Sequence, residues 1–329
     1  MMLPGVVLKK FKLAGEDFGR GLSNLVLYIA QPALIVYAYL SCESDFSAIW
    51  QNCLATLLLS VLAHVLFSAT ALALFRRYPD GRRRMLRMTT IFSNAAFMGI
   101  PLIQSILGSE AAIYASIYNI TFNIFLWTLG VHLCTRQDGE DMDGDGDSDI
   151  ADELLSAKKH IGREVSLLKL LTHPVTLASV IGVILLVTGV NVATLESVGL
   201  SLVSDSLAML RGLVAPLSMV VIGLRLANMS LKGAFSDTGM YLFLALRHFI
   251  LPLAVVLVIK LLTIVGLPIS EVASTVTVIL ASTPSASSAT MFAEKYNCDA
   301  TYTSRLVIIS TILSIASMPA VLALSQLIL

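Results

Sequence analysis

A proline inside an apolar segment of membrane-spanning length constrains the fold of this chain most. The segment near residues 270–293 contains the hydroxyl-rich run Leu280-Ala-Ser-Thr-Pro-Ser-Ala-Ser-Ser-Ala-Thr290. Because Pro284 has no N–H and its ring clashes with the preceding turn, it breaks the helix and leaves backbone groups unpaired. In a bilayer such backbone is tolerated only inside protein or beside water. We therefore expect other helices to surround this break.

The composition indicates a membrane protein. Of 329 residues, 56% are hydrophobic and 13% are charged, which is more apolar material than one soluble core needs. We predict an all-α polytopic membrane protein embedded in a lipid bilayer. The net charge of zero does not indicate a nucleic-acid partner. The four cysteines show neither Cys-x-x-Cys spacing nor nearby histidines, so the sequence indicates no metal site, no cofactor and no disulfide framework.

Nine segments are apolar enough and long enough to cross a bilayer, which takes about 20 residues. Their predicted positions are near residues 21–41, 50–75, 86–107, 110–134, 170–190, 198–227, 240–265, 270–293 and 303–328. Four spans precede the loop at 135–169 and five follow it. The loop nominally contains a calcium-binding pattern from Asp141 to Asp152, but it lacks the Glu that should close such a loop. We interpret it as a disordered acidic linker.

Lysine and arginine gather in alternate connections between the spans. They occur before the first span, between the second and third, and in the middle loop, whereas the connections after spans one, three, five and seven have none. Cytoplasmic loops are enriched in positive charge. The chain is therefore predicted to lie in the cell membrane with a cytoplasmic N-terminus and an external C-terminus.

The two halves of the chain repeat each other. Pro32 and Pro216 lie in similar stretches 184 positions apart, and Pro101 and Pro284 lie 183 positions apart. By the charge pattern, the matching spans cross the membrane in opposite directions, so the repeats are inverted. The predicted domains are a first repeat at 1–134, the linker at 135–169 and a second repeat at 170–329. Five spans per repeat require ten, so we expect the first helix to be missing, through a truncated gene model or a real deletion.

Paired breaks in inverted repeats predict a ligand site. The first break is Ser93-Asn-Ala-Ala-Phe-Met-Gly-Ile-Pro101. Half-helices that begin at the two prolines would direct unpaired amides and positive helix ends at a carboxylate. The candidate substrate-binding residues are Asn94, Gly99 and Pro101 on the first break; Ser282, Thr283, Pro284, Ser285 and Ser287 on the second; and Asn119 and Asn123 on the fourth span. Alternatively, the hydroxyl groups satisfy their own helices, and the two asparagines serve helix packing.

Charged groups inside the spans are few. Arg247 and His248 lie about two turns inside the seventh span, where we expect them to extend to the interface, although a gate is the alternative. No Asp or Glu lies at mid-depth. This argues against a carboxylate relay for protons or sodium, and the choice between these two coupling ions stays open.

Several motifs resemble the auxin efflux carrier family. Asn94-x-x-x-Met-Gly-Ile-Pro-Leu102 resembles its first crossing helix, and Ala293-Glu-Lys-Tyr-Asn297 resembles the stretch after the second. The stretch at 215–225 and the closing Thr311-x-x-Ser-x-x-x-x-Pro319 are similar to bacterial members. The resemblance implies a fold like that of bacterial sodium/proton antiporters, with ten helices in two inverted repeats. It also implies a site where two broken helices cross, elevator-type movement and a homodimer.

These observations predict a secondary membrane transporter for a small organic anion, such as a dicarboxylate or an auxin-like carboxylate. The alternative is a non-transporting membrane sensor or a degenerate carrier that lacks its first helix. An enzyme is not expected, because the spans show no Ser/His, His/Glu or paired-Asp constellation at mid-depth.

Overall fold

The computed structural model describes residues 3–15, 17–42, 46–135, 174–227, 237–296 and 298–329. These residues form helices and one isolated antiparallel bridge. The first part of the chain contains α1 (Leu3–Lys10), α2 (Phe18–Leu25), η1 (Val26–Ala30), α3 (Gln31–Leu40), α4 (Phe46–Leu74), α5 (Asp80–Ile91), η2 (Ala95–Gly99), α6 (Ile100–Phe125), η3 (Leu126–Gly130) and α7 (Val131–Thr135). The second part contains α10 (Pro174–Thr188), α11 (Val192–Ser197), α12 (Ser201–Gly212), α13 (Val214–Ala227), α14 (Thr238–Ala245), η5 (Leu246–Ile250), α15 (Leu251–Ile264), α16 (Glu271–Ser282), α17 (Ser288–Lys295) and α18 (Ala300–Ile328).

The predicted all-α polytopic fold is confirmed. The described residues contain six helices that are long and apolar enough to cross a membrane: Phe18–Leu40, Ile49–Leu74, Glu110–Thr135, Ser201–Leu224, Thr238–Ile264 and Ala300–Ile328. Three shorter apolar helices, Ala95–Gly108, Pro174–Thr188 and Glu271–Ser282, lie where the remaining three spans were predicted. The loop interpreted as an acidic linker, with its nominal calcium pattern, lies outside the described residues. The division into repeats stays a prediction.

Large apolar side chains cover the outside of the bundle. Leu202, Met209 and Leu261 are 77%, 76% and 61% exposed, and each lies on an apolar helix. An apolar surface of this kind suits the hydrocarbon interior of a bilayer.

Three wide helical turns precede prolines. The π-helical segments η1, η2 and η5 each end one residue before an X-Pro pair, with Pro32, Pro101 and Pro252 in the following first turn. A proline ring would collide with the carbonyl four residues earlier, and a π-turn relieves this clash. The prolines therefore bend these spans without ending them.

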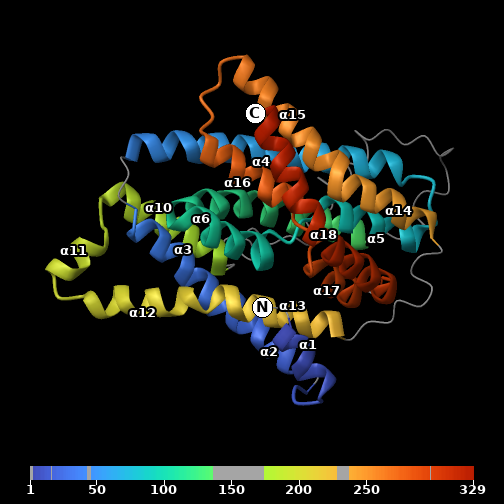
Figure 1. The fold of residues 1–329 in the computed structure, drawn as a ribbon, viewed down its shortest axis with the longest axis horizontal. Helices are drawn as coiled ribbons and strands as arrows, with labels where there is room; N and C mark the ends of the chain where they lie inside the picture. The colour runs from blue at the N-terminus through green and yellow to red at the C-terminus, as the bar shows by residue number, and fades with distance from the viewer. Residues whose placement is uncertain (1–2, 16, 43–45, 136–173, 228–236, 297) are drawn as a thin grey trace.

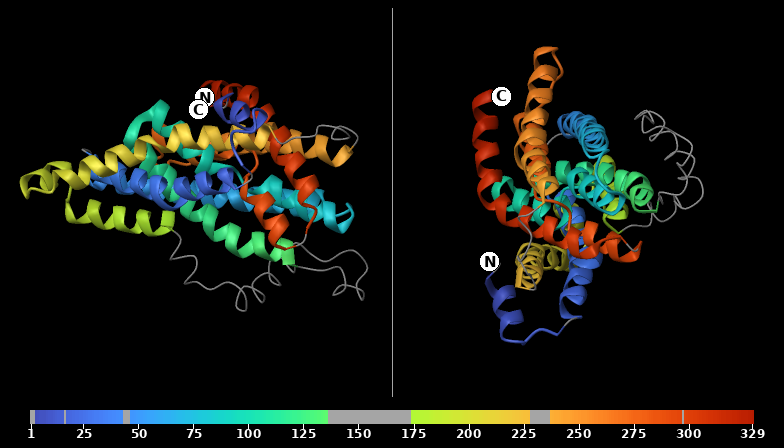
Figure 2. Two further views of the ribbon diagram at one scale, coloured as in Figure 1. Left: turned by 90° about the horizontal axis from the view of Figure 1, so that it is seen from below. Right: turned by 90° about the vertical axis from the view of Figure 1, so that its right-hand side faces the viewer.

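The helices pack in two groups (Figure 1). The first group consists of α4, α5, α7 and α14 to α18, and the second consists of α1 to α3, α10, α12 and α13. Figure 2 shows α12 and α13 lengthwise in its left view and nearly end-on, beside the N-terminal helices, in its right view. Each predicted repeat contributes helices to both groups, while α6 packs against members of each.

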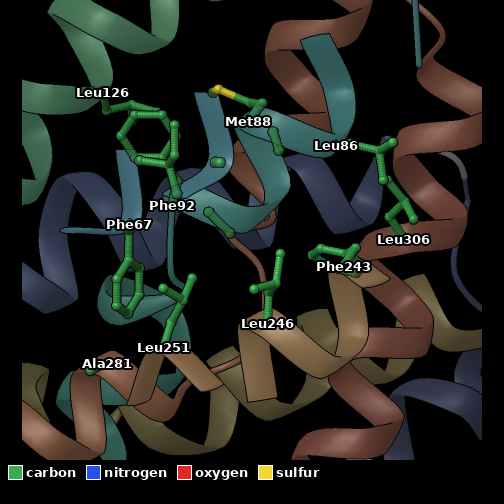
Figure 3. Packing of buried hydrophobic residues seen from close by; sticks show 14 of the residues in the cluster. Phe67, Leu86, Met88, Phe92, Leu126, Phe243, Leu246, Leu251, Ala281 and Leu306 are labelled. Carbon is green, nitrogen blue, oxygen red and sulfur yellow. The ribbon is translucent and has the colours of Figure 1, made fainter. Parts of the chain in front are cut away.

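The broken segments contribute to the apolar clusters of both groups. Phe92, Ala281 and Ala286 lie in the cluster of the first group, whereas Ala95 and Leu280 lie in that of the second. Figure 3 shows Phe92 among Met88 and Leu126, with Ala281 at the opposite side of the same cluster. The breaks are therefore buried where the two groups meet.

Close packing at this meeting point depends on Gly99. A Cβ atom at Gly99 would collide with the side chain of Leu280 and lie 3.3 Å from Thr283 Cγ2. Leu280 is itself fully buried, so it has little room to move. The glycine thus permits the close approach of two helices.

We predict that Gly99→Ala lowers the free energy of unfolding by about 1–3 kcal/mol, the usual cost of an overpacked core. Gly212→Ala is the matched control, because a Cβ there meets no atom within 4 Å. Thermal unfolding in detergent should separate the two variants. Equal melting temperatures would show that the packing at Gly99 is not tight.

Candidate functional site

The two breaks meet through their backbones. Asn94 N–H donates to Pro284 O at 2.7 Å, and Ala286 N–H donates to Phe92 O at 2.8 Å. These bonds flank an antiparallel bridge between Ser93 and Ser285. The predicted contact between two interruptions 183 positions apart is confirmed, and we call this meeting of 92–94 with 283–287 the crossing.

The half-helices begin at different residues from those predicted. After α5 ends at Ile91, Phe92 is extended (φ −95°, ψ 120°), and the next helical turn starts at Ala95 instead of Pro101. On the other side α16 ends at Ser282, and Thr283 (φ −59°, ψ 152°) is extended because a proline follows it. The second half-helix starts at Ser288, not directly after Pro284. Pro101 therefore bends an existing helix, while Pro284 ends one.

The amides expected to bind a ligand at the second break are partly occupied. Ser285 N–H donates to Ser310 Oγ at 2.9 Å, and Ala286 N–H donates to Phe92 O. Two of the three amides from Ser285 to Ser287 are thus used within the protein. The first turn of the other half-helix, starting at Ala95, has no side-chain cap, and its leading amides have no acceptor within the helix.

The hydroxyl groups divide into two kinds. Ser282 Oγ donates to Val278 O at 2.5 Å and Thr283 Oγ1 donates to Leu280 O at 2.8 Å, so these two satisfy their own helix, as the alternative interpretation held. In contrast, Ser285 Oγ is buried without a hydrogen-bond partner in the described structure. It is thus the hydroxyl of the second break most ready to bind a ligand. Ser287 is also buried.

The predicted asparagines are buried and keep bonding capacity. Asn94 is 5% exposed, and its side chain makes no capping bond. On α6, Asn119 Oδ1 and Asn123 Nδ2 are buried, and neither atom has a hydrogen-bond partner in the described structure. A buried amide without its partners is costly. These groups therefore favour a polar ligand or water, although the structure does not bring Asn119 or Asn123 into a hydrogen bond with the crossing.

Arg247 was misplaced by sequence reasoning. It does not extend to the interface: its side chain is fully buried, and Nη2 donates to Thr283 O at 2.7 Å while Nη1 donates to Thr90 O at 3.3 Å. These carbonyls end the first halves of the two broken helices. The guanidinium also lies over the ring of Phe67, 5.1 Å from its centroid.

The charge of Arg247 is not balanced by a carboxylate in the described part of the chain. Its Nε has no hydrogen-bond partner there, and no Asp or Glu among these residues forms an ion pair with it. Two half-helix N-termini, at Ala95 and Ser288, add positive potential. A buried, unpaired cation next to helix N-termini is suited to an anion.

His248 was also expected at the interface and is fully buried instead. Its Nδ1 lies 2.8 Å from Ser317 Oγ and its Nε2 lies 2.9 Å from Ser310 Oγ. Nothing in the sequence indicated that this histidine contacts serines 62 and 69 positions away. Ser310 Oγ also accepts a hydrogen bond from Ser285 N–H. Ser310 therefore connects the histidine to the crossing.

Gln31 is a buried residue of the site that the sequence reasoning did not consider. Its Nε2 donates to Ala96 O in the first turn of the half-helix, and its Oε1 is buried without a partner in the described residues. The Gln31-Pro32 pair within the repeated stretch was the available indication. Among the described residues, no group of three or more His, Cys, Asp or Glu could hold a metal ion.

A multi-spanning bundle whose two broken helices cross at a buried cation is the architecture of a membrane carrier. A family model described as "Membrane transport protein" matches residues 1–322. An "Uncharacterized transporter" of Methanothermobacter thermautotrophicus is 28% identical over 323 residues, covering 97% of this chain and 93% of the relative. The chain belongs to this family of membrane transport proteins, the auxin efflux carrier family.

We predict that Arg247→Ala lowers the free energy of unfolding by about 1–3 kcal/mol, because the carbonyls of Thr90 and Thr283 would stay buried without this donor. Arg20→Ala is the control, since the Arg20 side chain is 78% exposed. Thermal unfolding in detergent should show the difference. Equal stability of both variants would mean that Arg247 does not support the crossing.

Proposed function

We propose that this protein is a secondary carrier for a small organic anion that binds at the crossing. The observation that carries this proposal is the buried guanidinium of Arg247, held by carbonyls of both broken helices and facing no carboxylate in the described structure. A carboxylate would supply the missing charge. Asn94 and the first amides of the half-helix at Ala95 would donate hydrogen bonds to it.

Two predicted classes of substrate fit this chemistry. A dicarboxylate such as succinate and an auxin-like carboxylate such as indole-3-acetate both present a carboxylate to Arg247. The apolar residues around the crossing, among them Phe67 and Phe92, give the indole compound additional contacts. The site therefore selects for charge first and for size second.

Transport requires the buried site to reach water on each side in turn. The two packing groups give a physical basis for elevator-type alternating access, in which the group that holds α14 to α18 moves along the other. The second group, with the apolar outer face of α12, would form the fixed part and the contact of a homodimer. The positive charge in alternate loops supports a cytoplasmic N-terminus. An accessibility label at Glu196 that reacts only from the cytoplasm would contradict this orientation.

We predict that Asn94→Ala weakens carboxylate binding by about tenfold to a hundredfold, the cost of one hydrogen bond to a charged group. Succinate and indole-3-acetate are compared with putrescine and tryptamine, which have similar frames and the opposite charge. Binding is measured by thermal shift on purified protein, and uptake is measured in proteoliposomes.

Asn191→Ala is the matched control. On the exposed surface, Asn191 Oδ1 accepts a hydrogen bond from Thr194 N–H and caps α11. Losing this side chain affects a helix end that is far from the crossing in sequence. Stabilisation by the amines but not by the carboxylates would refute the proposed substrate class. Binding of a carboxylate without any uptake would favour the alternative of a non-transporting sensor.

A further inference from the structure

His248 is hydrogen-bonded in a way that suits a change of charge. Both of its ring nitrogens face serine hydroxyls of α18, Ser310 and Ser317. A hydroxyl can donate or accept, so it satisfies a ring nitrogen with or without a proton. The same surroundings therefore accept either neutral tautomer and the imidazolium.

His64 provides a contrast within the same protein. Its Nδ1 lies 2.7 Å from Ser60 O, a carbonyl that can only accept, so Nδ1 must hold the hydrogen. The rings of Tyr118 and Phe125 lie 5.3 Å and 5.2 Å from its own ring. The contact therefore fixes the tautomer of a neutral His64, whereas the hydroxyl partners of His248 leave both of its tautomers open.

The hydrogen bonds of His248 lead directly to the crossing. Ser310 Oγ accepts from Ser285 N–H, so its own hydrogen is free to be donated to an unprotonated Nε2 of His248. When Nε2 gains a proton, it donates to Ser310 Oγ instead, and the hydroxyl hydrogen must turn elsewhere. Because the same hydroxyl also accepts a hydrogen bond from the amide of Ser285, this change in its hydrogen bonding reaches the crossing.

Charge links the histidine to the anion site. Arg247 precedes His248 on η5, and a second buried cation beside it is unfavourable while the crossing holds no anion. An anion at the crossing offsets that repulsion. A bound anion therefore raises the affinity for the proton, and a bound proton raises the affinity for the anion by the same factor.

The helices packed against η5 place no other buried charged group against His248 in the described residues. On α18 it faces the two serine hydroxyls, and α16 contributes the carbonyl of Thr283 to its neighbour Arg247. On α15, Lys260 donates to Leu329 O at the chain end, and on α14 Tyr241 is 52% exposed. His64 of α4 and Tyr118 of α6 are close enough to Arg247 to interact with its charge.

We propose that His248 binds a proton that crosses the membrane together with the anion, with Ser310 passing its charge state to Ser285 at the crossing. The inference rests on the proposed function and makes the protein a proton–anion symporter. The proton enters from water on the side to which the site is open and leaves on the other side with the anion. No bond other than that to the proton is made or broken.

The first test uses the wild-type protein in weakly buffered detergent solution. A saturating concentration of succinate or indole-3-acetate, whichever stabilises the protein, should cause the uptake of about one proton per protein at pH 7. Carboxylate binding without proton uptake would refute the symport while leaving the anion carrier intact. Failure of both carboxylates to bind would refute the proposed function itself, and the symport with it.

The second test uses proteoliposomes with a pH gradient and no membrane potential. With the membrane potential held at zero and one proton carried per anion, a gradient of about one pH unit should concentrate succinate, which does not cross a bilayer as the neutral acid near pH 7, up to about tenfold. His248→Gln stays neutral but keeps a donor and an acceptor, so it should exchange anion across the membrane without responding to the gradient. His64→Gln is the matched control and should respond like the wild type.

Ser310→Ala keeps the imidazole and removes the hydroxyl that connects it to Ser285. Its accumulation under the gradient should be weaker than that of the wild type, and it provides a result if His248→Gln does not fold. Full gradient-driven accumulation by folded His248→Gln would overturn the proposal. The proposal would also be overturned if Ser310→Ala accumulated the anion fully while His64→Gln lost its accumulation.

Discussion

The structure depends on one constraint: backbone groups released by a broken helix must find partners where no water is available. Here each break supplies partners for the other. The amide of Asn94 bonds to the carbonyl of Pro284, and that of Ala286 bonds to the carbonyl of Phe92. Arg247 then satisfies one carbonyl from each first half-helix. A single side chain thus stabilises both breaks and places a positive charge between them.

This arrangement connects stability with recognition. Donors used for the protein's own backbone are not available to a ligand, and Ser282, Thr283 and the amide of Ser285 are used in this way. The groups that keep bonding capacity at the crossing include Asn94, the hydroxyl of Ser285 and the unbonded Nε of Arg247. The proposal of an anion carrier rests on the charge of Arg247 among these groups, which a carboxylate would balance.

Much of the fold could be predicted from the sequence, because hydropathy and proline position act locally. The nine apolar segments and the meeting of the breaks at Ser93 and Ser285 follow from these features. The helix starts could not be placed: the first half-helix begins at Ala95, because a π-turn accommodates Pro101. The roles of Arg247 and His248 were missed because their burial depends on helices packed from distant parts of the sequence. From the sequence alone, the two side chains were expected to extend to the membrane interface.

The central claim is that the crossing holds the substrate's carboxylate against Arg247. The most direct measurement is a structure of the protein with a bromine-labelled indole-3-acetate, whose position is found from anomalous scattering. The account predicts one ligand with its carboxylate within hydrogen-bond distance of Asn94 and the Arg247 guanidinium. A ligand bound elsewhere, or one at the crossing with its carboxylate turned away from Arg247, would contradict it.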